Sequence, residues 1–116
     1  MSGIADKINE LVASGEIASF GELRDIRDYC RDAEQFVSDI REILEDSPSP
    51  DDFRSFGATA VYLRREGRRI ANRLSDEWWR TQPRRTPFGA IRQAVLNLHL
   101  EVERCIAQDL PFSIRA

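Results

Sequence analysis

A strict alternation of three- and four-residue steps between apolar residues constrains the fold more than any other feature of this chain. The apolar positions are Leu23, Ile26, Cys30, Ala33, Val37, Ile40 and Leu44. Because an α-helix turns once every 3.6 residues, this spacing places all of these side chains on one face. The pattern therefore predicts a helix that ends near Asp46, with a buried seam about 40 Å long at 1.5 Å per residue.

The same spacing returns in a second stretch, which predicts another long helix that begins near Pro50. Its apolar positions are Phe53, Phe56, Ala60, Leu63, Gly67, Ile70 and Leu74. Gly67 lies on the seam, where a side chain is expected. Since a glycine costs a helix about 1 kcal/mol relative to alanine, we expect a neighbouring backbone to approach closely there.

Two further helices complete the expected fold. Residues 2–14 form a short amphipathic helix that Gly15 closes, and Thr86 with Pro87 begins a last long helix that ends near Asp109. That helix carries Ile91, Ala94 or Val95, Leu98, Val102 and Cys105 on one face. With no strand-like alternation in the chain, we predict an all-α fold. It is a single domain over residues 1–116, a helical bundle of three long helices plus a short N-terminal helix.

Length and composition exclude several classes of protein. The chain has 116 residues, 41% of them hydrophobic, which suits one domain with a buried core. No apolar run approaches the roughly 18 residues that a membrane span needs, and the N-terminus does not resemble a signal peptide. Cys30 and Cys105 both fall on apolar faces, so we expect two reduced, buried thiols in a cytoplasmic protein, with a single bridge between them as the alternative.

Charge is divided unevenly between the two halves of the chain. The formal net charge of −3 by itself argues against a nucleic-acid binder. However, residues 1–56 carry six basic and fourteen acidic groups, giving −8, whereas residues 57–116 carry eleven and six, giving +5. The average therefore hides an acidic second helix and a basic third one.

A stripe of four arginines and one tyrosine lies opposite the apolar seam of the third helix. It consists of Tyr62, Arg65, Arg69, Arg73 and Arg80, flanked by Arg64, Arg68, Arg84 and Arg85. One interpretation is a solvated face, or arginines paired with acids of the second helix such as Asp28, Asp32, Asp39 and Glu42. The other is a strip that contacts the phosphates of RNA or DNA, with Tyr62 and Trp79 stacking on bases. We expect Arg69 and Arg73, at the back of the helix, to stay available.

Two leucines of the last helix are out of register with its core. Leu96 and Leu100 fall about 140° and 180° around the helix from the apolar stripe, where leucines favour association. Either this helix lies centrally between others, or these leucines contact a partner protein or a second copy. In the second case the tail (Leu110, Phe112 and Ile114) and the acidic helix, with Asp28 and Asp32, contribute to the contact.

The residues that catalysis requires are scarce. His99 is the single histidine, and no glycine-rich phosphate loop or paired-cysteine motif occurs, so we expect no metal and no small-molecule cofactor. Arg92 and His99 are nevertheless seven residues apart, which resembles the arginine-histidine motif of HEPN ribonucleases. The alternative is a histidine at the bundle edge that makes an ordinary hydrogen bond.

Three segments of the chain resemble the small helical subunit of type III CRISPR effector complexes. They are the helix start at Ser19-Phe20-Gly21-Glu22-Leu23-Arg24-Asp25-Ile26, Ala60-Val61-Tyr62 followed by the arginines, and the last helix from Phe88 through Ala94 to His99. The glycine-arginine pair of that family corresponds here to Gly67-Arg68, displaced by a few residues. The resemblance implies a non-catalytic subunit that is stacked in an antiviral assembly and touches nucleic-acid backbone.

The sequence thus leaves three functional hypotheses. The first is a non-catalytic helical subunit of a larger assembly that contacts RNA through Arg65, Arg69 and Arg73, while its acidic helix meets a basic face of the next subunit. The second is a bacterial or phage-encoded adaptor or inhibitor that binds protein alone, through the acidic helix and the two leucines. The third is a HEPN-like ribonuclease that uses Arg92 and His99.

Overall fold

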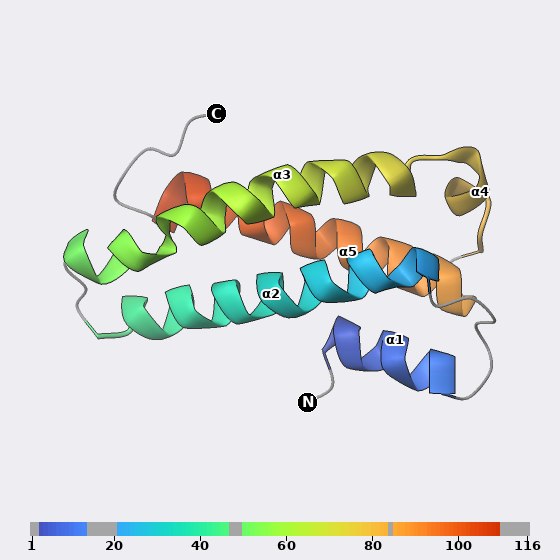
Figure 1. The fold of residues 1–116 in the computed structure, drawn as a ribbon, viewed down its shortest axis with the longest axis horizontal. Helices are drawn as coiled ribbons and strands as arrows, with labels where there is room; N and C mark the ends of the chain where they lie inside the picture. The colour runs from blue at the N-terminus through green and yellow to red at the C-terminus, as the bar shows by residue number, and fades with distance from the viewer. Residues whose placement is uncertain (1–2, 14–20, 47–49, 84, 110–116) are drawn as a thin grey trace.

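The computed structural model of the chain describes residues 3–13, 21–46, 50–83 and 85–109, and these ranges contain helices and no strand. The α-helices are α1 (Ile4–Ala13), α2 (Gly21–Leu44), α3 (Gly57–Leu74), α4 (Glu77–Arg80) and α5 (Pro87–Arg104). A 3₁₀ helix (Pro50–Phe56) precedes α3, and a π-helical turn (Cys105–Asp109) follows α5. The prediction of an all-α bundle is confirmed, and Figure 1 shows its three long helices lying side by side.

The helix α5 is the centre of the bundle, since it packs against each of the other four α-helices. In Figure 1, α1 and α3 lie on opposite sides of the pair formed by α2 and α5. The helices α2 and α3 run antiparallel: the rings of Phe36 and Phe56 meet at one end, and Arg73 approaches Asp25 at the other. The two faces of the α2–α5 pair are therefore covered by different helices.

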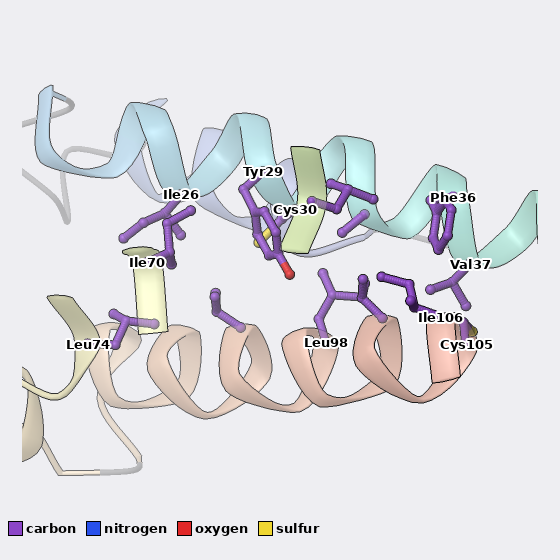
Figure 2. Close-up of a cluster of buried hydrophobic side chains, with 14 of the residues drawn as sticks. Ile26, Tyr29, Cys30, Phe36, Val37, Ile70, Leu74, Leu98, Cys105 and Ile106 are labelled. Carbon is purple, nitrogen blue, oxygen red and sulfur yellow. The ribbon is translucent and has the colours of Figure 1, made fainter. Parts of the chain in front are cut away.

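The predicted seam of α2 forms the core, with one exception. Six of its seven residues, from Leu23 to Ile40, are buried, and Figure 2 shows Ile26, Cys30 and Val37 directed into the bundle. Leu44 is 40% exposed, so its expected place in the core is wrong. Cys105 and Ile106 lie beside Val37, and Leu44 lies seven residues further along, in the last turn of α2.

The predicted third helix is broken into three elements. Pro50–Phe56 is a 3₁₀ helix, α3 ends at Leu74, and Asp76 takes an extended conformation (φ −61°, ψ 150°) before α4 begins. The end of α3 is stabilised because Arg92 donates from Nε to the carbonyl oxygen of Leu74 at 2.8 Å. The assignment of Arg80 to the arginine stripe of the third helix is therefore wrong, because the turn at residues 75–76 places it on α4.

Aromatic packing fixes α4 on α5. The ring of Trp79 meets the rings of Trp78 and Phe88 edge-on, with centroids 5.1 Å and 5.8 Å away. Trp79 is 6% exposed, so the expectation that it stacks on bases is wrong, whereas Trp78 is half exposed. The short α4 thus closes the end of the bundle.

The close approach at Gly67 comes from side chains, and the expectation of a neighbouring backbone is wrong. A Cβ atom at Gly67 would lie 2.6 Å from Nδ1 of His99 and 2.9 Å from the hydroxyl oxygen of Tyr29. Glycine is required on this seam because α2 and α5 both direct a polar side chain at α3 there.

Several smaller predictions concern helix ends and cysteines. Thr86 caps α5 as expected, because its hydroxyl oxygen accepts a hydrogen bond from the Gly89 N–H at 3.3 Å. Cys30 and Cys105 are both buried and form no disulfide with each other, as expected for reduced thiols. Ser19 of the predicted capping pair Ser19–Glu22 lies outside the described residues, as do Leu110, Phe112 and Ile114 of the tail. No helix in the described part of the chain is long and apolar enough to cross a membrane.

Candidate functional site

The helix α3 concentrates positive charge on one element. Five of its 18 residues are arginines, and Glu66 is its single acid. Arg65 lies about 200° around the helix from the buried Leu63, so it points directly away from the bundle. Arg65 and Arg68 are exposed, and neither forms an ion pair within the described ranges. These two side chains are the available cations of α3, and we call them the outer arginines.

Arg69 and Arg73 turn toward α2 instead. Arg69 approaches Glu66 at 2.8 Å and Asp25 at 3.4 Å, and Arg73 approaches the same Asp25 carboxylate at 3.8 Å. The expectation that both stay available is wrong, because α2 presents Asp25 alongside them. Asp25 is 55% exposed and Arg69 is 45% exposed, so solvent screens the pair and it contributes at most about 1 kcal/mol.

Two of the four acids that the sequence suggested as partners of these arginines, Asp28 and Asp32, pair with arginines of α2 instead. Asp28 approaches Arg27 at 2.9 Å and Arg31 at 3.8 Å, and Asp32 approaches Arg31 at 3.6 Å, all on α2 itself. The pairing of Asp25 with Arg69 and Arg73 was not predicted, because a helical wheel of one helix does not show how that helix is rotated relative to its neighbour.

Tyr62 lies apart from the outer arginines, at the groove between α2 and α3. Burial raises the pKa of its hydroxyl, and the carboxylates of Asp32, Glu66 and Asp28 raise it further. Asp32 and Asp39 also line a cavity of about 320 Å³ beside Tyr62. Tyr62 therefore stands in a negative environment, which separates it from the predicted phosphate strip.

Of the two leucines, one is exposed and one is covered. Leu100 is 65% exposed, whereas Leu96 packs partly against the core because α5 lies between the other helices. Leu100 lies on α5, whereas Asp28 and Asp32 lie on α2, where Asp32 faces the groove toward α3.

A buried polar cluster lies between the three long helices, and sequence reasoning did not find it. The hydroxyl oxygen of Tyr29, Nδ1 of His99 and Oε1 of Glu103 are buried and have no hydrogen-bond partner among the described residues. The other carboxylate oxygen of Glu103 accepts from Arg64 at 3.3 Å. The glycine on the seam was the sequence signal, since it marks where His99 and Tyr29 approach α3.

Burial is the main influence on the pKa values of His99 and Tyr29. It lowers the pKa of His99, and Arg68 lowers it further, while Glu103 acts in the opposite direction. It also raises the pKa of Tyr29, helped by Cys30 and Glu103. The lowered pKa favours the neutral imidazole of His99, and its Nδ1 lacks the ordinary hydrogen bond expected from the sequence among the described residues.

The arginine and histidine of the HEPN-like spacing have different surroundings. Arg92 binds the carbonyl at the end of α3, and His99 lies two helical turns away, about 10.5 Å along the axis at 1.5 Å per residue. In the described part of the chain, no group of three or more metal-ligating side chains is brought together.

Comparison with protein-family models, with curated proteins and with solved structures finds no match to this chain. Function must therefore be argued from the surface itself. Its most distinctive features are the outer arginines of α3, the exposed Leu100 and the grooves between the helices.

Proposed function

We propose that the chain is a non-catalytic helical subunit of a larger assembly, and that α3 contacts the phosphate backbone of RNA. This is the role that the resemblance to the small subunit of type III CRISPR effector complexes implies. The observation that carries the proposal is the exposure of Arg65 and Arg68 without an ion pair in the described ranges. Guanidinium groups in that state offer their donors to phosphate without first losing another partner.

Arg69 supports this surface at small cost. Its contacts with Asp25 and Glu66 are exposed to solvent, and such surface pairs contribute about 0–1 kcal/mol each. A phosphate that approaches α3 can therefore draw Arg69 away from Asp25. The proposed backbone-contact surface is thus Arg65 and Arg68, with Arg69 recruited on binding.

The acidic half of the chain has a role in the same proposal. The exposed acids of α2 belong to a different helix from the outer arginines, so one copy offers both a negative and a positive face. Stacked subunits with such faces attract one another, and like-charged contacts disfavour the wrong register. We infer that the charge division orders neighbouring subunits along a nucleic acid.

The test is RNA binding by a double charge reversal, Arg65→Glu with Arg68→Glu. Fluorescence anisotropy with a labelled single-stranded RNA of about 20 nucleotides is measured at about 50 mM and about 200 mM salt. We expect the wild type to bind with a salt-dependent affinity. The variant should bind at least about tenfold more weakly and with a shallower salt dependence, because each lost phosphate contact reduces the slope by about 0.7.

The matched control reverses Arg24 and Arg31, which are exposed on α2 and change the net charge by the same amount. Circular dichroism checks that both variants remain helical. Equal loss of affinity in the two variants would show that only net charge matters, and unaltered binding by the α3 variant would exclude the surface.

A second candidate, a protein-only adaptor or inhibitor, is favoured by one observation. Leu100 is 65% exposed on α5, although a leucine of this exposure in a bundle gains from being covered. Leu100→Ser should abolish binding to such a partner while leaving RNA binding intact. RNA affinity that is unchanged in Leu100→Ser but lost in the α3 variant would favour the first candidate.

A further inference from the structure

The groove between α2 and α5 is filled by α1 along only part of its length. The N–H of Ile4 donates to Oε1 of Glu34 at 2.9 Å, and Arg27 donates to Asn9 at 3.3 Å, so α1 runs antiparallel to α2. At 1.5 Å per residue, the ten residues of α1 span about 15 Å, whereas the 24 residues of α2 span about 36 Å. Figure 1 shows α2 continuing well beyond the end of α1.

The part of the groove beyond Ile4 is a hollow of about 760 Å³. Its apolar lining comes from three elements: Ile4 of α1, Val37 of α2, and Ala94 and Leu98 of α5. These residues extend the surface on which α1 already packs its fully buried Ile8. The hollow therefore continues the groove in which α1 packs and is not an isolated depression on the surface.

The rim of this hollow is strongly acidic. Four carboxylates line it, those of Glu34, Glu42, Glu45 and Glu101, against the single cation Arg41. Arg41 is already paired with Glu101, and Glu34 holds the N–H of Ile4. Glu42 and Glu45 are exposed and form no ion pair within the described ranges, so the rim keeps uncompensated negative charge.

We propose that this groove binds a basic amphipathic helix of a partner protein, laid end to end with α1. An apolar floor between two helices accepts the apolar face of a third, as α1 demonstrates, and the acidic rim selects lysine and arginine on its flanks. From Glu34 to Glu45 the groove is about 17 Å long, which corresponds to about 11 helical residues. The site lies across the α2–α5 pair from α3, so it does not depend on the proposed RNA contact.

The test uses a synthetic peptide as the probe. A labelled peptide of about 14 residues, with leucine on one helical face and lysine elsewhere, is compared with a peptide of the same composition in scrambled order. We expect the wild-type chain to bind the amphipathic peptide at least about tenfold more tightly, a difference of about 1.4 kcal/mol. Equal binding of the two peptides, or no binding, overturns the proposal.

Two variants locate the binding. Ser38→Trp places an indole in the hollow without changing charge or emptying the core, and Glu42→Lys with Glu45→Lys reverses the rim. Each should reduce affinity for the amphipathic peptide at least about tenfold. The matched controls, Asn72→Trp on α3 and Asp76→Lys with Glu77→Lys at the start of α4, should bind within about twofold of wild type. Retained binding by Ser38→Trp would overturn the proposal.

Sedimentation of the wild type and Ser38→Trp identifies a competing occupant. We expect the wild type and Ser38→Trp to have the same oligomeric state. A wild-type dimer that Ser38→Trp dissociates would assign the groove to a second copy of the chain and overturn the proposal of a partner helix.

Discussion

His99 of α5 lies directly against Gly67 of α3, so close that a Cβ atom at Gly67 would be 2.6 Å from Nδ1 of the imidazole. The hydroxyl group of Tyr29 approaches the same glycine from α2. In Figure 2 the Tyr29 ring extends from α2 into the space between the helices. All three long helices thus meet at one residue whose only contribution is the absence of a side chain.

We predict that Gly67→Ala destabilises the fold. Alanine improves helix propensity by about 1 kcal/mol, but the Cβ overlap with His99 and Tyr29 costs about 1–3 kcal/mol, so a net loss of about 1 kcal/mol is expected. Urea unfolding followed by circular dichroism measures it. In the background of His99→Ala the ring is gone, and the loss should shrink by at least about 0.5 kcal/mol. An identical loss in both backgrounds would contradict the steric explanation.

Tyr29→Phe should be unusually well tolerated. The hydroxyl oxygen of Tyr29 is buried without a hydrogen-bond partner among the described residues, so its removal relieves desolvation and breaks no bond described there. We expect the free energy of unfolding to stay constant or rise by up to about 1 kcal/mol, whereas loss of a hydrogen-bonded hydroxyl costs about 1 kcal/mol. Tyr62→Phe on the exposed groove is the control. A decrease of more than about 1 kcal/mol in Tyr29→Phe would reveal a partner for the hydroxyl.

Stability should fall as the pH decreases below neutrality. Burial lowers the pKa of His99 in the folded state, so below about 6.5 the unfolded chain takes up the proton first and gains relative stability. The stabilising contribution is present above the unfolded pKa and is lost as the pH falls through the folded one. Because His99 is the single histidine, urea midpoints at about pH 7.5 and about pH 5.5 isolate its effect. In His99→Gln the difference between the two midpoints should shrink; an unchanged difference would assign it to carboxylates.

The periodicity of the sequence predicted the elements of the fold well, because a seam such as Leu23 to Ile40 has only one helical face to bury. The periodicity did not predict burial at positions where the packing of neighbouring helices determines it. Leu96 is partly covered because α5 is central, whereas Leu44 continues the seam of α2 and is nevertheless 40% exposed. Neither outcome is encoded in the residues next to these leucines.

The candidate surface was predicted less well than the fold, for a related reason. The wheel of α3 gave the outward direction of Arg65 correctly, since that direction depends on α3 alone. It did not give the turn of Arg69 and Arg73 toward Asp25, which depends on how α2 is rotated against α3. Arg80 does not lie on the predicted stripe, because the helical periodicity of α3 does not continue through the extended residue Asp76.

The thiol of Cys30 should be unreactive in the native protein. Burial raises its pKa to about 12, and the nearby Glu34 acts in the same direction. Since the thiolate is the reactive form, a disulfide reagent at about pH 8 should label the thiol only after the chain unfolds. Cys105→Ser isolates Cys30, and labelling of this variant with and without urea is followed by absorbance. Rapid labelling of the native variant would show that α2 opens locally around Cys30.

Arg92 should behave as a structural residue, because its Nε binds the carbonyl oxygen of Leu74 where α3 ends. Arg92→Met keeps most of the aliphatic stem and removes this bond, and we expect the free energy of unfolding to fall by about 1–3 kcal/mol. Arg85→Met, at an exposed position, should change it by less than about 0.5 kcal/mol.

The ribonuclease hypothesis makes a different prediction for the same protein: wild type cleaves RNA, and His99→Ala does not. Cleavage that Arg92→Met abolishes without loss of stability would make Arg92 part of an active centre, whereas lost stability and no cleavage by wild type would leave it as the cap of α3.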